Sequence, residues 1–275
     1  MKIITRMLIL VAVVATLFSA TGCNKLQARD QLNKGVAAYK GTHYEQAIDH
    51  FRKAVDLDPS LLNARLYLAT ALANQYVPGV PDPDNEKIAQ QAIDEFQKVL
   101  EMKPVVEQQV GSLKGIASLY FNMKQLDKAK EYHRKVAALD PNDPETYYSI
   151  GVIDWTESYQ PRMEERGKLG LKPEAPLNDK AVCSALKSKN WNIILDGMEN
   201  LKKALDLRPD YDDAMAYVNL MYREKADVEC DDPAQRAADL KTADEWVDKT
   251  MAQKKANAEK KQAATGGGVT MDNTQ

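Results

Sequence analysis

Histidine often serves as a general base or a metal ligand near neutral pH, and the chain contains three, His43, His50 and His133. His50 and His133 fall within helical patterns, and His133 takes a position where related segments carry a bulky packing residue. No H-E-x-x-H motif, glycine-rich phosphate loop or G-x-S-x-G motif accompanies them. We therefore expect the histidines to be packed or solvated, and we predict that the chain is not an enzyme.

Asp82, Asp84 and Glu86 alternate in the way that the first ligands of a calcium-binding loop do. Such a loop also needs a glycine at its sixth position and a glutamate at its twelfth, where this chain has Lys87 and Ile93. The segment is therefore not a calcium loop, and no other motif predicts a metal or a cofactor.

The composition excludes several classes of protein. The chain has 37 Lys and Arg against 40 Asp and Glu, a net charge of −3, whereas a nucleic-acid-binding protein usually has a basic excess. With 44% hydrophobic residues, 13 Gly and 12 Pro, the chain is neither collagen-like nor disordered throughout. A charged fraction of 28% with four Phe and three Trp indicates helices with solvated faces around a modest core.

The first residues have the pattern of an export signal. Lys2 and Arg6 precede an apolar run over residues 7–18, and small residues follow it up to Cys23. A helix of this length reaches about 18 Å, too short for the roughly 30 Å hydrocarbon core of a membrane. The sequence Ser19-Ala20-Thr21-Gly22-Cys23 resembles the lipobox of bacterial lipoproteins, although Ala20 stands where the family usually has Leu.

The resemblance implies that residues 1–22 are a cleaved signal peptide and that Cys23 becomes acylated. An ordinary cleaved signal and a retained N-terminal anchor are the alternatives. In the family, Asp after the cysteine often retains a lipoprotein at the inner membrane, and Asn24 stands there instead. We therefore expect a lipid-anchored protein on the outer membrane, facing the periplasm.

Four segments of the remaining chain share one pattern. In each, a small residue is followed at +4 by a bulky residue, at +7 by Ala or Val, and at +12 by Pro. The first three positions lie on one stripe of a helix, and the proline ends that helix. The segments are 47–59, 92–104, 129–141 and 197–209.

This pattern resembles the second helix of the tetratricopeptide repeat (TPR), and first-helix positions such as Gly35, Ala117 and Gly151 agree with it. The resemblance covers residues 28–255 and implies an all-α fold, a TPR-type α-solenoid of about four to five helix pairs with a C-terminal capping helix. The expected domains are a signal peptide (1–22), a lipidated N-terminus and short linker (23–27), the solenoid (28–262), and a disordered tail (263–275).

Two insertions interrupt the repeat, near residues 74–86 and 160–190. The first is rich in Pro, Gly and Asn, which predicts a loop. The second adds 34 residues between Gly151 and Gly197, the length of one repeat. The chain therefore holds either four repeats with a long insert, or five with Asn178–Lys189 and Trp191–Leu207 as a degenerate unit and Glu145–Tyr159 as an unpaired helix.

Cys183 and Cys230 remain once Cys23 is acylated, and exported proteins rarely keep exposed thiols free. Both cysteines fall between the first-helix and second-helix signatures of successive units. Such positions repeat along one edge of a solenoid. A disulfide between them is therefore feasible. Two buried thiols are the alternative.

The resemblance implies a protein or peptide partner bound in a concave groove lined by first helices. The terminal-carboxylate clamp of chaperone-binding TPR proteins is absent, because Leu32 and Val36 stand at its first-unit positions. Trp155 could instead pack under the 161–176 segment. The predicted groove residues are Tyr39, Asn63, Asn74, Asn122, Tyr148, Trp155 and Arg223.

The function favoured by these observations is a membrane-anchored scaffold or adaptor in the bacterial cell envelope. The alternative is a periplasmic lipoprotein that binds a glycan or a small molecule, with inserts near Tyr76 and Tyr159 forming the pocket. The identity of the partner and the process it serves stay open.

Overall fold

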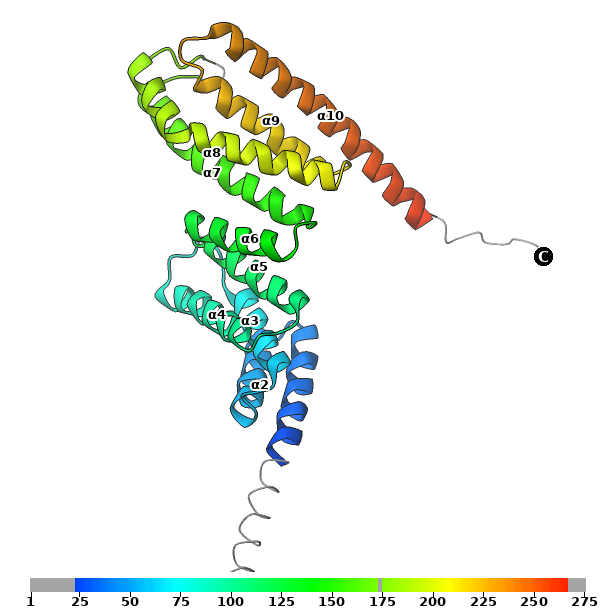
Figure 1. Cartoon of the computed structure of the whole chain (residues 1–275). Coiled ribbons are helices and arrows are strands. Elements are labelled where there is room, and N and C mark those ends of the chain that lie inside the picture. The colour runs from blue at the N-terminus through cyan, green and yellow to red at the C-terminus, as the bar shows by residue number, and fades with distance from the viewer. Residues whose placement is uncertain (1–22, 173–174, 267–275) are drawn as a thin grey trace, which may run out of the picture. The chain divides into compact units, whose positions relative to one another are not determined.

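The computed structural model describes residues 23–172 and 175–266, and within these ranges all regular structure is α-helical (Figure 1). The predicted all-α fold is thereby confirmed. The chain divides into two compact units, one ending at Tyr132 and one beginning at His133, so that the boundary falls inside α6. After a helix over residues 23–40, the elements are α2 (Tyr44–Leu57), α3 (Leu62–Gln75), α4 (Pro83–Glu101), α5 (Val106–Asn122), α6 (Leu126–Leu139), α7 (Pro144–Lys168), α8 (Lys180–Leu207), α9 (Asp212–Asp227) and α10 (Pro233–Gly266).

Four of the described helices begin at an aspartate that caps them. The side chains of Asp82, Asp143, Asp179 and Asp232 accept hydrogen bonds from backbone N–H groups of the first turns of α4, α7, α8 and α10. In α4, α7 and α10 a proline follows directly, and its fixed φ suits the first helical position. These starts are therefore encoded locally in the sequence.

The repeated stripe is the core of the fold. Its small, bulky and Ala-or-Val positions are buried in all four segments, because each second helix presents this stripe to the helices it packs against. His133 is buried at the bulky position of the third segment. The buried positions are Ala47, Phe51, Ala54, Ala92, Phe96, Val99, Ala129, His133, Val136, Gly197, Leu201 and Ala204.

In the first unit, α2 packs on α3, α3 on α4 and α4 on α5. The predicted loop near 74–86 is shorter than expected, since α3 continues to Gln75 and α4 already begins at Pro83. Asn85, in the first turn of α4, holds the connection. Its side chain donates to the carbonyls of Val77 and Val80 and accepts from the N–H of Val77.

In the second unit, α7 packs on α8, α8 on α9 and α9 on α10, and these helices lie side by side (Figure 1). The five-repeat interpretation with an orphan helix is wrong, because residues 178–207 do not form two helices and α7 is not unpaired. Instead α7 and α8 are both lengthened and stay paired. A Cβ on Gly151 would approach Leu201 Cγ to 2.5 Å, so only glycine allows this packing distance.

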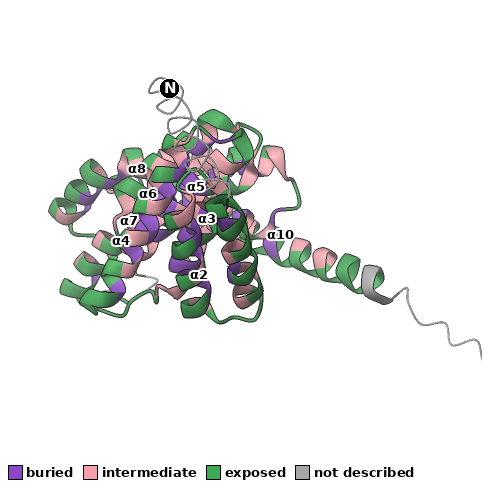
Figure 2. Cartoon of the chain, turned by 90° about the horizontal axis from the view of Figure 1, so that it is seen from below, coloured by how far each residue is buried: buried purple, intermediate pink, exposed green. Residues whose placement is uncertain are grey.

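The N-terminal and C-terminal limits differ from the prediction. The first described helix includes the expected linker at 23–27, and α10 extends to Gly266, beyond the expected end of the solenoid at 262. The predicted signal peptide (1–22) and the tail beyond Gly266 lie outside the described residues. The second half of α10 exposes most of its side chains, as a terminal capping helix does (Figure 2). Within the described residues, no helix is long and apolar enough to span a membrane.

Candidate protein-binding surface

In the first unit, predicted groove residues connect successive first helices. Asn74 at the end of α3 donates a short hydrogen bond from Nδ2 to the hydroxyl of Tyr39 on the helix 23–40. At the start of α3, Asn63 accepts a 3.4 Å bond from Gln108 of α5. Asn122 is the last residue of α5 and is half-buried. These side chains therefore lie along the first helices, and two of the four contact each other.

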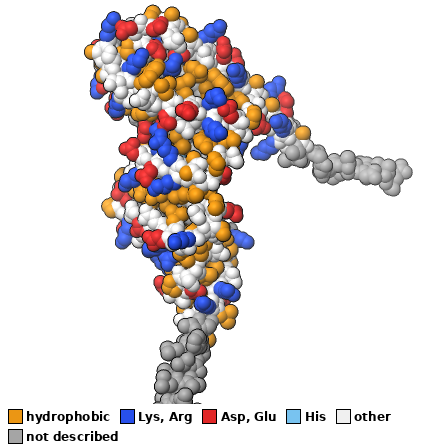
Figure 3. All heavy atoms as spheres, in the orientation of Figure 1, with side chains coloured by type: hydrophobic (Ala, Val, Ile, Leu, Met, Phe, Trp, Pro, Cys, Tyr) orange, Lys and Arg blue, Asp and Glu red, His pale blue; other side chains and the backbone are white. Residues whose placement is uncertain are grey.

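In the second unit, aromatic side chains form a row between the first helices α7 and α9. The Tyr217 ring lies with its centroid 5.6 Å from Tyr148 and 5.5 Å from Trp155, edge to face in both cases. The row continues from Tyr148 to Tyr211 at 4.9 Å and from Trp155 to Tyr159 at 4.7 Å. Figure 3 shows hydrophobic side chains gathered over α9 on this view of the unit.

Sequence reasoning identified Tyr148 and Trp155 but missed Tyr211 and Tyr217. The signal available was the density of aromatic residues in α7 and α9. Trp155 packs between Tyr159 and Tyr217, and its indole N–H is buried with no hydrogen-bond partner in the described residues. The side chain therefore belongs to this row.

Tyr148 and Tyr217 of the row stay neutral at physiological pH. Burial raises the pKa of Tyr148 to about 12, and the nearby Tyr217, Asp213 and Glu145 add to the effect. Burial and Asp213 also raise the pKa of Tyr217. The row therefore offers apolar ring faces with neutral hydroxyls, which suit contact with a peptide rather than proton transfer.

Arg223, the remaining predicted groove residue, is held within its own unit. Its Nη2 lies 2.7 Å from Asp244 Oδ1 of α10, and its Nε donates to Asn219 at 2.9 Å. The guanidinium is therefore a link between α9 and α10 as well as part of the surface.

A buried ionic cluster lies at the far end of the lengthened α7, and sequence reasoning missed it. Arg162 binds both carboxylate oxygens of Glu224 at 2.6 and 2.8 Å and reaches Asp227 at 2.7 Å. Arg166 lies 3.0 Å from Asp227 and donates to the carbonyls of Lys172 and Ala175. Burial raises the pKa of Glu224, although Arg162 opposes the shift.

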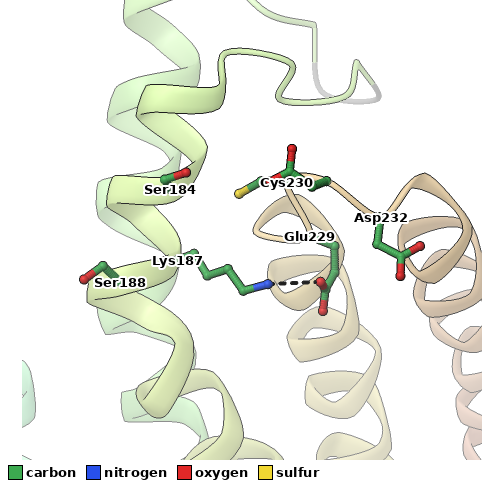
Figure 4. Close-up of a pocket in the computed structure, with 7 residues that line it drawn as sticks. Ser184, Lys187, Ser188, Glu229, Cys230 and Asp232 are labelled. Atoms are coloured by element: carbon green, nitrogen blue, oxygen red, sulfur yellow. Dashed lines mark hydrogen bonds and ion pairs between the residues drawn. The ribbon is translucent and has the colours of Figure 1, made fainter.

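Next to this cluster, Cys183 of α8 and Cys230 form a disulfide with a Cα–Cα distance of 5.7 Å. The bridge ties α8 to the segment that joins α9 and α10. A pocket of about 280 Å³ lies beside it (Figure 4). Ser184, Lys187 and Ser188 line it from α8, and the Lys187 side chain points toward Glu229, with which its Nζ forms an ion pair of 3.2 Å.

A second pocket, of about 480 Å³, lies among α2, α3 and α4, with acidic and basic side chains over Leu68 and Leu72. Tyr76 and Tyr159, expected in a ligand pocket, line neither of the two. In the described part of the chain, no His, Cys, Asp and Glu side chains gather in a group that could hold a metal ion.

The sequence matches the tetratricopeptide-repeat family over residues 31–61 and 115–143. Both stretches fall in helix pairs without an insert, the pair of 23–40 with α2 and the pair of α5 with α6. The lengthened pairs α3–α4 and α7–α8 are not matched. No curated protein matches the sequence.

Several solved structures share the fold. A crystal structure of MamA protein has 13% identity and a TM-score of 0.56, covering 85% of this chain and 94% of that one. A MamA from Desulfovibrio magneticus RS-1 has 18% identity and a TM-score of 0.56, covering 84% and 96%. YrrB, described as a TPR protein with an unusual peptide-binding site, has 15% identity and a TM-score of 0.52, covering 88% and 97%. The chain is thus an all-α protein with the TPR-type α-solenoid fold, and it contains tetratricopeptide repeats.

Proposed function

We propose that the chain is a lipid-anchored TPR scaffold of the bacterial cell envelope that binds a protein or peptide partner along its first helices. The observation that carries the binding surface is the row of Tyr148, Trp155 and Tyr217 on α7 and α9. Its rings are only half-buried, and Trp and Tyr are enriched among the residues that dominate binding energy at protein interfaces. The fold shared with the peptide-binding YrrB supports the same class of partner.

The proposed anchor is an acylated Cys23, which is exposed and unpaired at the start of the first described helix. Each CH₂ group of an acyl chain that is buried in the membrane contributes about 0.8 kcal/mol of binding free energy, and two or more acyl chains give stable attachment. Asn24 favours the outer membrane, facing the periplasm. The disulfide between Cys183 and Cys230 agrees with an oxidising compartment.

Site-specific photo-crosslinking in the native envelope tests the binding surface. A photoreactive residue replaces Asn63 or Tyr217 on the first helices, and Lys53 of α2 or Asn192 of α8 serves as the exposed second-helix control. We expect one partner to be captured from the first-helix positions. Capture from the control positions alone, or from none of the four, contradicts the proposal.

A pair of tryptophan variants tests the aromatic row. Trp155→Ala removes a member of the row, whereas Trp246→Ala removes a half-buried indole from α10 that Lys249 covers at 4.4 Å. We expect Trp155→Ala to lose the crosslinked partner and Trp246→Ala to keep it. If both variants retain the crosslinked partner equally, the aromatic row is not part of the binding surface.

The anchor has its own test. Mass spectrometry of the N-terminal peptide is expected to find acylated Cys23, and Cys23→Ser is expected to abolish it and to leave the chain unprocessed. A mature N-terminus elsewhere, or an unmodified Cys23, excludes the lipoprotein proposal while leaving the scaffold proposal standing.

A further inference from the structure

One edge of the first unit combines exposed apolar side chains with the proposed anchor. Three large hydrophobic residues there are among the most exposed in the described part of the chain: Leu26 at 72%, Val105 at 66% and Val106 at 53%. Leu26 lies on the helix 23–40, and Val105 and Val106 lie where α4 connects to α5.

Hydrogen bonds between the first helices place these residues at the same edge. Tyr39 bonds Asn74, so the ends of the helix 23–40 and of α3 lie close together. Asn63 bonds Gln108, so the start of α3 lies close to the start of α5, where Val105 and Val106 are. The starts of α3 and α5 therefore lie on one edge.

The connection between α2 and α3 belongs to this edge as well. Asp58 has a pKa held below its usual value by hydrogen bonds from Ser60, and the positive charges of Lys25 and Arg29 contribute. Those two basic residues must therefore lie near Asp58, at the start of the helix 23–40. Lys103 adds a third exposed cation, and Glu101 and Glu107 are the nearby acids at the third connection.

The absence of a linker decides how close this edge comes to a membrane. The first described helix already includes Cys23, so Leu26 is about 4.5 Å along the helix from the acylated residue. The headgroup layer on each side of a bilayer is roughly 5–8 Å thick. An acyl anchor at Cys23 therefore brings Lys25 and Leu26 into that layer.

We propose that this edge, residues 23–29, 58–61 and 102–106, lies on the membrane as a lipid-binding surface. This inference rests on the proposed acylation of Cys23. Leu26, Val105 and Val106 enter the headgroup layer, and Lys25, Arg29 and Lys103 contact anionic phospholipid headgroups. The opposite edge is apolar too, with Val77 at 53% and Val80 at 46% exposed, but Asp82, Asp84 and Glu86 follow it and disfavour an anionic surface.

Tryptophan quenching distinguishes the two edges. The acylated full-length mature protein is reconstituted into vesicles of phosphatidylethanolamine and phosphatidylglycerol whose acyl chains carry bromine, a contact quencher of indole. Val105→Trp reports on the proposed edge and Val80→Trp on the opposite one. The native Trp155, Trp191 and Trp246 all lie in the second unit and give the same background in both variants.

We expect the added tryptophan of Val105→Trp to lose its fluorescence on brominated vesicles and that of Val80→Trp to keep it. Replacing phosphatidylglycerol by phosphatidylcholine is expected to weaken the quenching, because the anionic headgroups are then missing. Equal quenching of the two variants, or stronger quenching of Val80→Trp, overturns the proposal.

Flotation of the same vesicles and the mass of the N-terminal peptide separate this proposal from the anchor. A protein that is acylated and floats without quenching of Val105→Trp is anchored but does not rest on this edge. A protein that is neither acylated nor afloat refutes the anchor, and the lipid-binding edge with it.

Discussion

The buried side chain of Asn85 hydrogen-bonds the irregular backbone segment that connects α3 to α4. Its amide reaches three backbone groups of Val77 and Val80 at 2.8–3.0 Å, and the side chain is buried. Buried backbone groups need partners, and a proline- and glycine-rich connection cannot provide them by helical pairing. One asparagine at the start of α4 takes that role.

Asn85→Ala is therefore expected to lower the free energy of unfolding by about 1–3 kcal/mol, because it leaves the Val77 N–H without its partner and removes a donor from the carbonyls of Val77 and Val80. Denaturant unfolding measures the loss, and limited proteolysis should show earlier cleavage between Val77 and Pro81. Gln90→Ala, which removes an exposed bond to Asp94, is the control and is expected to change stability by less than about 0.5 kcal/mol. Equal effects of the two substitutions would contradict the role of Asn85.

Glu145 ties the start of α7 to the end of α8. It accepts from Arg208 at 2.6 Å and from the hydroxyl of Tyr211. Burial disfavours its charge, but the hydrogen bonds from Tyr211 and Arg208 outweigh burial and hold the pKa of Glu145 below its usual 4.5. Its contribution to stability is therefore present above pH 4.5 and is lost as the pH falls through the lowered pKa.

Glu145→Gln is accordingly expected to be less stable than the wild type at neutral pH and to approach it on acidification below that lowered pKa. Urea unfolding across this pH range measures the difference. Asp206→Asn removes the exposed pair with Lys202 and is the control, with a smaller difference at neutral pH. A difference between wild type and Glu145→Gln that stays constant with pH would exclude the proposed linkage.

At the scale of elements, the lengthened α7 is attached to α9 by charges. The side chains of Arg162, Glu224 and Asp227 are each 2–11% exposed, so their ionic contacts are largely shielded from water. Removing one partner from such a cluster leaves an uncompensated buried charge, which is far costlier than losing a surface pair. The cluster therefore fixes where α7 lies on its own unit.

Arg162→Met is expected to lower the free energy of unfolding by about 3–5 kcal/mol, measured by denaturant titration. The double variant Arg162→Met/Glu224→Met should recover much of this loss, because Arg166 still neutralises Asp227. Arg134→Met, which breaks an exposed pair with Asp196, is expected to cost less than about 1 kcal/mol. A double variant no better than the single one would show that shape rather than charge holds the contact.

At the scale of the whole molecule, the disulfide belongs to the second unit alone. It closes a loop of 47 residues between Cys183 and Cys230. A cross-link of this span restricts the unfolded chain and stabilises the fold by about 4 kcal/mol in the chain-entropy model. The first unit, which ends at Tyr132, contains no residue of that loop.

Cys183→Ala/Cys230→Ala should therefore reduce hydrogen-exchange protection in α8, α9 and α10 by an amount equivalent to about 2–4 kcal/mol, with little change before Tyr132. Hydrogen exchange followed by mass spectrometry resolves the two units in one experiment. The wild-type protein under reducing conditions should behave like the double variant. A uniform loss across both units would contradict the assignment.

The repeat could be predicted from the sequence because its signature is local. The spacing of Ala47, Phe51 and Ala54 follows the helical period, and Pro59 ends the pattern within the same short segment. The same stripe is buried in all four predicted segments. The 34 extra residues could not be assigned in this way, because their number equals one repeat and counting alone does not distinguish a hidden unit from two longer helices.

What the sequence by itself determined is the all-α repeat, the starts of those helices that an aspartate caps, and the positions of its core residues. Only the tertiary structure decided the continuity of α8, the aromatic row and the pairing of Arg162 with Glu224, 62 residues apart. The physical reason is the range of the interactions. Helical periodicity and capping act within a few residues, whereas ion pairs and ring contacts depend on which helices become neighbours when the chain folds.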